Sequence, residues 1–233
     1  MRIPVCVIMG AGPGNGAHIG ARFAAAGYRV ALCARDIGRL EAIADGIEGA
    51  RAYNCDVRAI DGPESAVTRI REDMGPVQTL IYNAGAGAFA NIDDSSVDAF
   101  QAAWEVNARG LFLATKAVLP DLRAAGGGNI VVVGATASLR AGAEFLPFAS
   151  AKFAQRGVAQ SLARKLGPEM IHVSLLIIDG VIDLERTRRR FPDKPDGFFL
   201  DPAAIAESVF QVTQQAPQAW TFELDLRPSG ERW

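Results

Sequence analysis

The chain has 233 residues, of which 49% are hydrophobic and 21% charged, and its formal net charge is −2. This length is sufficient for one α/β domain with a full hydrophobic core. The small net charge gives no electrostatic case for a nucleic-acid or anionic membrane partner. Glycine or charge interrupts every apolar run well short of the ~20 residues that a membrane-spanning helix needs, so we expect no membrane segment.

The three cysteines, Cys6, Cys33 and Cys55, each lie in or at the end of an apolar segment. Their odd number and unpaired spacing argue against a disulfide scaffold, and no Cys/His cluster has the spacing of a zinc site. The first four residues run directly into a strand-like segment without the features of a signal peptide. We therefore expect reduced thiols, no metal site and a cytoplasmic location.

Short apolar segments alternate with longer amphipathic ones, which predicts alternating strands and helices. The predicted strands are 3–9, 29–34, 51–55, 79–82, 129–134, 172–178 and 220–226, and the predicted helices are 15–26, 37–46, 63–74, 97–125, 145–166 and 202–215. Several strands are nearly continuous in apolar character, as central strands of a parallel sheet are. The pattern predicts a doubly wound parallel sheet with helices on both faces, in a single domain over residues 1–233.

Helix ends carry their own signals in this sequence. Asp201 followed by Pro202 is typical of an N-cap and a first helical residue. Gly27, Gly75 and Gly167 stand where three of the predicted helices should end.

Residues 179–200 form the one irregular stretch, rich in Arg, Pro, Gly and Phe. They follow the sixth strand and so emerge at the carboxyl edge of the sheet, where such folds bind ligands. We interpret the stretch as a substrate lid, and a plain surface loop is the alternative.

A glycine-rich turn joins the first strand to the first helix. Its sequence, Gly10-Ala11-Gly12-Pro13-Gly14-Asn15-Gly16, fits two dinucleotide-binding registers, one through Gly12 and Gly14 and the other through Gly10, Gly14 and Gly16. Glycines allow close approach of a diphosphate, and the helix start offers free N–H groups and a positive dipole. Asn15 adds an amide that can bind phosphate.

Taken in order, the motifs of residues 3 to about 183 resemble the short-chain dehydrogenase/reductase family. The matching positions are the glycine turn, Asp56-Val57, Asn83-Ala84-Gly85, Asn107 and Lys152. The resemblance implies a Rossmann-type NAD(P)-binding domain with strand order 3-2-1-4-5-6-7 and oxidoreductase activity.

The same resemblance implies roles for these residues. Asp56 and Val57 would flank the adenine, and the Asn83-Ala84-Gly85 turn would pass beside the adenine ribose. Asn107 would organise a water chain that leads to Lys152, which would hold the nicotinamide ribose.

Arg35 bears on the choice of cofactor. An NAD site uses a carboxylate at the end of the second strand to accept from the ribose 2′-hydroxyl. By alignment to the family that position is Ala34, and Arg35 follows it. Because a guanidinium suits a 2′-phosphate, we expect NADP(H) rather than NAD(H). Asp36 is expected either to neutralise Arg35 in part or to cap the next helix.

The catalytic set that the resemblance implies is incomplete. Phe148 stands four residues before Lys152, where the family has its proton-donating Tyr, and Ala135 stands thirteen residues before Phe148, where the family has a Ser. Asn107 and Lys152 remain. Loss of a general acid and of an oxyanion donor removes roughly 10²–10⁴-fold each, so another group must replace them if the chain is an active enzyme.

Several polar residues are candidates for that replacement, each with an ordinary structural role as the simpler interpretation. They are Thr136, Ser138, Glu144, Ser150, Asp179 and Asp183, together with Lys152 acting through a water molecule. A substrate that needs little acid help, such as an iminium or a conjugated acceptor, is a further alternative. His18 and His172 have no triad-like context and are expected to be structural.

Two functions remain open from the sequence. One is an NADP(H)-dependent oxidoreductase with an atypical proton donor, acting on a small carbonyl, alcohol or imine-like substrate. The other is a catalytically silent NADP(H)-binding protein that serves as a sensor or assembly partner. The long, Ala-rich helices 97–125 and 145–166 match the family's usual pairing helices, which implies a homodimer or homotetramer.

Overall fold

The fold is built on a parallel β-sheet that confirms the predicted doubly wound architecture. The computed structural model describes residues 3–87 and 89–230. Within this part of the chain a seven-stranded sheet has the order β3-β2-β1-β4-β5-β6-β9, as the family resemblance implied. Its strands are β1 (Val5–Met9), β2 (Arg29–Ala34), β3 (Ala50–Asn54), β4 (Val77–Tyr82), β5 (Gly128–Ala135), β6 (Ile171–Ile178) and β9 (Glu223–Leu226).

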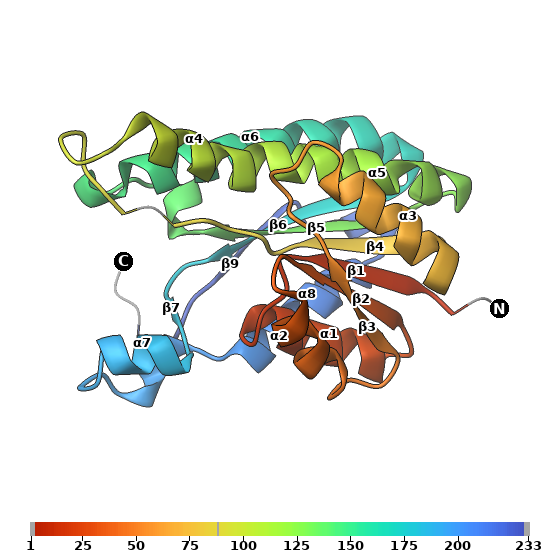
Figure 1. Ribbon diagram of the computed structural model, residues 1–233, viewed down its shortest axis with the longest axis horizontal. Helices are drawn as coiled ribbons and strands as arrows, with labels where there is room; N and C mark the ends of the chain where they lie inside the picture. Colours follow the sequence, from red (N-terminus) through yellow and green to blue (C-terminus); the bar gives the residue numbers. More distant parts are fainter. Residues whose placement is uncertain (1–2, 88, 231–233) are drawn as a thin grey trace.

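Helices cover both faces of the sheet and make three layers (Figure 1). One face carries α3 (Gly62–Met74), α4 (Val97–Trp104), α5 (Gly110–Ala124) and α6 (Leu146–Leu166); the other carries α1 (Asn15–Ala25), α2 (Ile37–Ala44) and α8 (Pro202–Thr213). The strands serve both cores because successive side chains point to opposite faces. In β1, Val5, Val7 and Met9 pack toward α3 and α5, whereas Cys6 and Ile8 pack toward α1 and α8.

Strand order reverses at β1, which places a crevice at the carboxyl edge of the sheet. β1 pairs with β2 on one side and with β4 on the other, all in parallel. Loops that leave adjacent strands toward opposite faces separate at such a point, and ligands of doubly wound folds bind there. The glycine turn after β1 and the loop after β4 lie at this position.

The predicted helix over 97–125 is confirmed as a continuous helical segment, but it contains a π-helical turn. It consists of α4, a π-helical turn over Glu105–Arg109, and α5. A π turn inserts one residue into an otherwise helical pattern, so the apolar periodicity on both sides still reads as helix.

Residues 179–200, predicted to be irregular, contain short regular elements. These are β7 (Val181–Ile182), α7 (Glu185–Arg190) and β8 (Phe199–Leu200), with β7 and β8 paired in parallel as a separate two-stranded sheet. Figure 1 shows α7 standing away from the main sheet, on the side of α1 and α8. Each element is too short for its periodicity to be recognised in sequence.

The predicted helix-end signals are largely confirmed. The Asp201 carboxylate accepts from the Ala203 N–H at 2.9 Å, as an N-cap does. Gly27 and Gly75 follow α1 and α3 with φ of +85° and +93°, a region that favours glycine. Gly167 follows α6 but stays right-handed at φ −53°, because a short 3₁₀ turn continues the chain there.

The three cysteines are buried free thiols. Burial raises the pKa of each, to about 11 for Cys55, which makes them poor nucleophiles. None of the helices in the described ranges is long and apolar enough to cross a membrane.

Asp121 of α5 forms hydrogen bonds with both α3 and β4, so its replacement tests the fold. Its buried carboxylate accepts from Arg71 Nε of α3 at 2.9 Å and from the buried Val77 N–H of β4 at 3.0 Å. We expect Asp121→Ala to lower the free energy of unfolding by about 3 kcal/mol, because it leaves the buried Val77 N–H without an acceptor and removes the carboxylate that pairs with Arg71. Urea unfolding measures the change. Glu185→Ala, which breaks an exposed pair with Arg189, should cost less than about 0.5 kcal/mol; equal losses would contradict the assignment.

Candidate functional site

The glycine turn is held against the loop after β4. Gly10 has φ of +84°, and a Cβ on it would lie 2.3 Å from Ala84 Cα, so a side chain does not fit. Asn83 Nδ2 donates to the Gly10 carbonyl at 2.7 Å. Two of the sequence motifs, far apart in the chain, therefore form one rigid unit at the switch point.

The start of α1 provides a site for an anion. Gly14, Asn15 and Gly16 are buried there. No side chain accepts a hydrogen bond from the backbone N–H groups of the first turn. Asn15 Oδ1 is buried without a hydrogen-bond partner among the described residues. A Cβ on Gly12 would have no atom within 4 Å, so the space above the turn is open at that point.

Leu184, which sequence reasoning missed, closes part of this turn. A Cβ on Gly14 would lie 2.7 Å from Leu184 Cδ2, so the segment after β6 packs directly on the glycine turn. No local signal identifies this contact, because the two residues are 170 positions apart in the printed sequence.

A cavity of about 370 Å³ gathers most of the sequence-predicted cofactor residues. It is lined by Gly10, Ala11, Ala34, Arg35, Cys55, Asp56, Val57, Arg58, Asn83, Ala84, Gly85, Ala86 and Val106. An adjoining cavity of about 420 Å³ includes Gly12, Arg35, Asp36 and Arg39 in its lining. The structure thus brings the ends of β1, β2, β3 and β4 to the 370 Å³ cavity, and the two cavities share Ala11, Ala34 and Arg35 in their linings.

Arg58, also missed from sequence, fixes Asp56 inside this cavity. The guanidinium donates through Nη2 to Asp56 Oδ2 at 2.8 Å, and the Arg58 backbone N–H donates to Oδ1 at 2.9 Å. These bonds hold the pKa of the Asp56 carboxyl below its usual value. The carboxylate is therefore oriented and ionised.

Two arginines border the second cavity with no ion pair in the described parts of the chain. They are Arg35 and Arg39, both exposed. The carboxylate between them, that of Asp36, accepts from the Arg39 backbone N–H at 3.1 Å as the N-cap of α2. This confirms the capping role, one of the two considered for Asp36, and leaves both guanidinium groups available to an anion.

Asn107 lies in the π turn and is fully buried. Its Nδ2 donates to the carbonyls of Ala103 at 2.8 Å and Ala86 at 3.2 Å. Its Oδ1 has no partner among the described residues. The π turn and the unpaired acceptor together are typical of a functional position in a helix.

Lys152 is buried at the start of α6 beside Asn107. Its Nζ donates to the Val133 carbonyl at 3.0 Å and to Gln155 Oε1 at 2.9 Å. Gln155, which is also fully buried, donates through Nε2 to the Asn107 carbonyl at 3.0 Å. Burial lowers the pKa of Lys152 to about 7. Sequence reasoning missed Gln155, although a polar residue three positions after Lys152 on a buried helix face was a signal.

Phe148 and Ala135 lie at the same edge and offer no proton. The half-buried Phe148 ring packs edge-on against Phe89, with centroids 5.6 Å apart, and lies 5.9 Å from Lys152 Nζ. Phe145 packs against Phe89 in turn, at 5.1 Å. The position that carries a hydroxyl in the family is part of an aromatic cluster, Phe89–Phe145–Phe148.

The polar residues near Ala135 are engaged in structural contacts. Thr136 Oγ1 donates to Asp179 Oδ1 at 2.6 Å, and Arg140 Nη2 donates to the same carboxylate oxygen at 3.1 Å. Ser138 is fully buried and accepts from the Ala135 N–H at 3.2 Å. These bonds join the loops after β5 and β6.

The other candidates for a replacement donor also have partners. Ser150 donates to the Pro147 carbonyl at 3.0 Å, and Glu144 accepts from Asn91 at 3.1 Å. These contacts favour the structural interpretation of both residues.

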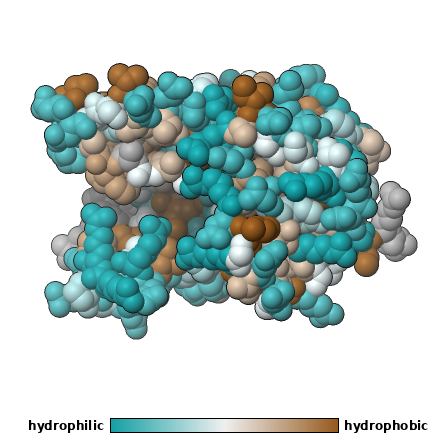
Figure 2. Space-filling model, in the orientation of Figure 1, coloured by the Kyte–Doolittle hydropathy of each residue, from teal (hydrophilic) through white to brown (hydrophobic). Residues whose placement is uncertain are grey.

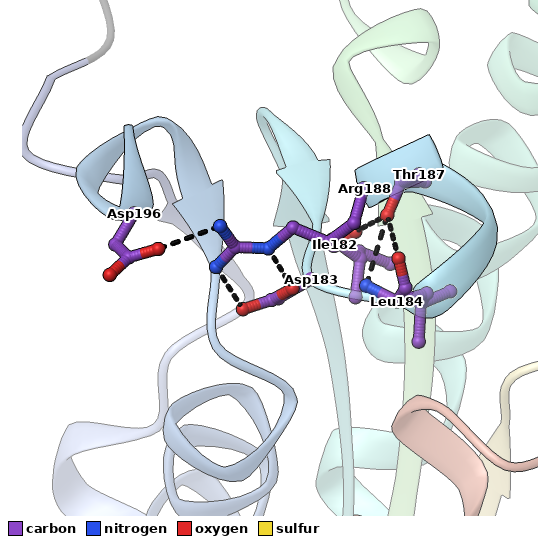
Figure 3. A network of polar contacts seen from close by, with 6 residues as sticks. All are labelled: Ile182, Asp183, Leu184, Thr187, Arg188 and Asp196. Atoms are coloured by element: carbon purple, nitrogen blue, oxygen red, sulfur yellow. Dashed lines mark hydrogen bonds and ion pairs between the residues drawn. The ribbon is translucent and has the colours of Figure 1, made fainter. Parts of the chain in front are cut away.

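Asp183 belongs to the framework of the 179–200 segment (Figure 3). Arg188 donates to its two carboxylate oxygens at 2.6 and 2.7 Å and to Asp196 at 2.6 Å. Arg188 holds the pKa of the Asp183 carboxyl below its usual value. Thr187 closes the turn by donating to the Ile182 carbonyl at 2.6 Å and accepting from the Leu184 N–H at 2.9 Å.

The molecular surface has a hollow between the α4 layer and the segment 179–200. Figure 2 shows the hollow between the layer that carries α4 and the projection that carries α7, with apolar surface at its back and polar surface on the α7 side of its rim. The space lies at the carboxyl edge of the sheet, where a substrate would enter.

The histidines have structural contacts. His18 Nδ1 lies 3.0 Å from the Gly14 carbonyl, and His172 stacks on Trp220 with its Nε2 2.9 Å from the Thr221 carbonyl. Within residues 3–87 and 89–230 there is no group of three or more His, Cys, Asp and Glu side chains that could hold a metal ion.

Comparison with known proteins agrees with this geometry. A family model described as short chain dehydrogenase matches residues 4–194. An uncharacterized oxidoreductase from Staphylococcus saprophyticus is 26% identical over 229 residues, 96% of this chain and 97% of that protein. A cis-1,2-dihydrobenzene-1,2-diol dehydrogenase from Pseudomonas putida is 33% identical over 175 residues, 71% of this chain and 62% of that enzyme.

Solved structures match over almost the whole chain. A short-chain dehydrogenase from Rhodopseudomonas palustris has a TM-score of 0.84 at 34% identity, covering 98% of this chain and 100% of that one. An alcohol dehydrogenase from the archaeon Thermococcus sibiricus, complexed with 5-hydroxy-NADP, has a TM-score of 0.87 at 29% identity and 99% coverage of both chains. A metagenomic short-chain oxidoreductase in complex with NADP has a TM-score of 0.84 at 26% identity and 98% coverage of both. Sequence and structure together show that the chain belongs to the short-chain dehydrogenase family.

Proposed function

We propose that the protein is an NADP(H)-dependent oxidoreductase acting on a small carbonyl, alcohol or imine-like substrate, with a proton donor other than tyrosine. The observation that carries the proposal is the buried Lys152 amine, held in place at the edge of the sheet that also carries the glycine turn. A buried amine without a structural ion pair is expensive to keep, so a role in chemistry accounts for it.

The residues around the hollow fit a dinucleotide of this kind. Gly10, Gly12, Gly14, Asn15 and Gly16 would hold the diphosphate through backbone and amide N–H groups. Asp56, Val57, Asn83, Ala84 and Gly85 would hold the adenosine. The buried Asn15 Oδ1 and Asn107 Oδ1, without partners among the described residues, support a polar occupant.

Arg35 and Arg39 would hold the 2′-phosphate of NADP(H), because both arginines line the second cavity and Asp36 is used as a cap. Two of the solved relatives contain an NADP-type ligand, which supports the same choice. Lys152 would hold the nicotinamide ribose. The bound nicotinamide would supply or accept the hydride.

A catalytically silent NADP(H)-binding protein is the second candidate. It is favoured by the absence of a hydroxyl at both Phe148 and Ala135 and by the structural partners of the nearby polar groups, such as Thr136 and Asp179. Under this alternative the protein would act as a sensor or assembly partner.

Further properties are proposed with the function. We place a single NAD(P)-binding domain over residues 1–233, with 179–200 as the substrate lid, supported by the contact of Leu184 with the glycine turn. A homodimer or homotetramer through α4, α5 and α6 is supported by their exposed aromatic residues, Phe100, Trp104, Phe112 and Phe153. Buried free thiols are consistent with a cytoplasmic location.

Arg35 provides the test of the cofactor. We expect Arg35→Ala to weaken NADPH binding by roughly 10- to 100-fold, because a charge-assisted contact with the 2′-phosphate is lost. NADH binding should change less than about twofold. Titration calorimetry with both dinucleotides measures the effect. Arg164→Ala, an exposed arginine near the end of α6 and so at the opposite edge of the sheet, is the matched control. Equal losses for NADPH and NADH would count against the 2′-phosphate assignment.

Turnover separates the enzyme from the silent binder. We expect NADPH oxidation with at least one member of a carbonyl and imine panel, and a loss of roughly 10²-fold or more in Lys152→Ala. Phe148→Tyr with Ala135→Ser should raise ketone turnover, because it supplies the missing acid and oxyanion donor. Phe210→Tyr adds a hydroxyl on α8, which covers the opposite face of the sheet, and should have no effect. NADPH binding without Lys152-dependent turnover would establish the silent alternative.

A further inference from the structure

The Lys152 amine has no anionic partner in the described part of the chain. Charged residues on the elements packed around it pair elsewhere: Glu105 with Arg109, Arg140 with Asp179, and Arg156 with Glu223. The groups that hold Lys152 are neutral dipoles, the Val133 carbonyl and the Gln155 amide. An ammonium in such surroundings gives up its proton far more readily than one in water, and burial accordingly lowers the pKa of Lys152 to about 7.

Gln155 fixes the direction of this amine. Both ends of its buried amide are used, Oε1 as acceptor from Lys152 at 2.9 Å and Nε2 as donor to the Asn107 carbonyl at 3.0 Å. The amide cannot rotate without breaking both bonds. It orients Nζ but adds no charge, whereas a carboxylate at this position would stabilise the ammonium.

Two of the three N–H groups of the ammonium are used, by the Val133 carbonyl and by Gln155 Oε1. A Cβ on the exposed Gly85 would lie 3.7 Å from Lys152 Nζ and 3.5 Å from Asn107 Oδ1. The amine therefore lies directly beneath a residue that lines the 370 Å³ cavity. The phenyl ring of Phe148, 5.9 Å from Nζ, lies where the family has its proton-donating hydroxyl.

We propose that Lys152 itself exchanges the proton with the substrate oxygen, and that Gln155 is the residue that positions its Nζ for the exchange. The inference rests on the oxidoreductase function proposed above. In the direction of reduction, the carbonyl carbon accepts a hydride with its two electrons from a reduced nicotinamide, and the C=O π pair moves to oxygen. The oxygen takes a proton from the Lys152 ammonium as an N–H bond breaks and an O–H bond forms. The neutral amine then regains a proton from solvent.

The first test is the pH dependence of carbonyl reduction. Reduction needs the protonated amine, so kcat should fall as pH rises through about 7, the pKa of Lys152. Gln155→Glu brings a carboxylate to Nζ and should move the midpoint up by about one pH unit; Gln155→Leu removes an acceptor and should move it down by a similar amount. Gln160→Glu and Gln160→Leu, on the same helix, are matched controls that should leave it in place.

Lys152→Arg separates proton transfer from mere positive charge. A guanidinium keeps the charge but does not release its proton. We expect kcat to fall by roughly 10²-fold or more while KM changes little. Turnover by the arginine variant at the wild-type rate would overturn the proposal.

The second test needs no turnover. The chain has four lysines, Lys116, Lys152, Lys165 and Lys194, so ¹³Cε-lysine NMR of the cofactor-free protein can follow each one against pH. The signal assigned by its loss in Lys152→Met should titrate near pH 7 and move with Gln155→Glu and Gln155→Leu in the same opposite directions as kcat. The three exposed lysines serve as internal controls.

The outcomes distinguish this inference from the proposed function. If NADPH still binds and is oxidised but both midpoints stay fixed, Lys152 is not the proton donor, and the oxidoreductase function stands. If wild-type protein shows no Lys152-dependent turnover, both the proposed oxidoreductase function and proton transfer by Lys152 are wrong. Opposite shifts in kcat and in the NMR titration support the inference.

Discussion

The loop Asn83–Ala86 is held by hydrogen bonds on both sides, and the two halves of the site depend on it. On one side Asn83 binds the Gly10 carbonyl, which fixes the glycine turn. On the other side Asn107 binds the Ala86 carbonyl and is itself bound by Gln155, which holds Lys152. This relay of hydrogen bonds joins the ends of β1, β4 and α6 across more than half of the sequence. A shift of the loop would therefore displace both the surface offered to a diphosphate and the amine beside the substrate space.

The segment 179–200 is organised on a different principle. Its framework consists of charge pairs, with Arg188 between Asp183 and Asp196 and stacked 4.1 Å from the Phe199 ring. These side chains are partly exposed, and exposed ion pairs contribute little to stability. The pairs therefore define the shape of the segment, but breaking them costs little free energy. The interior relay is made of buried neutral groups, for which each lost bond leaves an unsatisfied polar atom. The buried hydrogen bonds beneath the hollow are therefore costly to break, whereas the exposed ion pairs of residues 179–200 are not.

The sequence predicted the sheet well because its signals are local. β6 is buried along its full length and was recognisable as a nearly continuous apolar run, and the glycine turn followed from residue types within seven positions. The positions of Asp56, Asn83, Asn107 and Lys152 depended on resemblance, and the structure places two of them, Asp56 and Asn83, in the lining of one cavity. Gln155, Leu184 and Arg58 could not be placed because their roles arise from contacts across the fold or from a side-chain direction. The π turn escaped detection because one inserted residue leaves the helical pattern on each side intact.

In the proposed mechanism, the phenyl ring of Phe148, which by resemblance takes the place of the family's tyrosine, and the acidity of Lys152 are physically linked. A tyrosine hydroxyl beside an amine would offer it a polar partner, and an ionised phenolate would favour the ammonium strongly. Phe148 does neither, and with Phe89 it places an apolar surface beside the amine instead. Desolvation by such surroundings disfavours the charged form, which makes the ammonium a better acid. In that mechanism, Phe148 lacks a hydroxyl and also makes the Lys152 ammonium a stronger acid. A single substitution thus accounts for the loss of one proton donor and the gain of the other. In this arrangement Gln155 and the Val133 carbonyl hold the amine among buried groups.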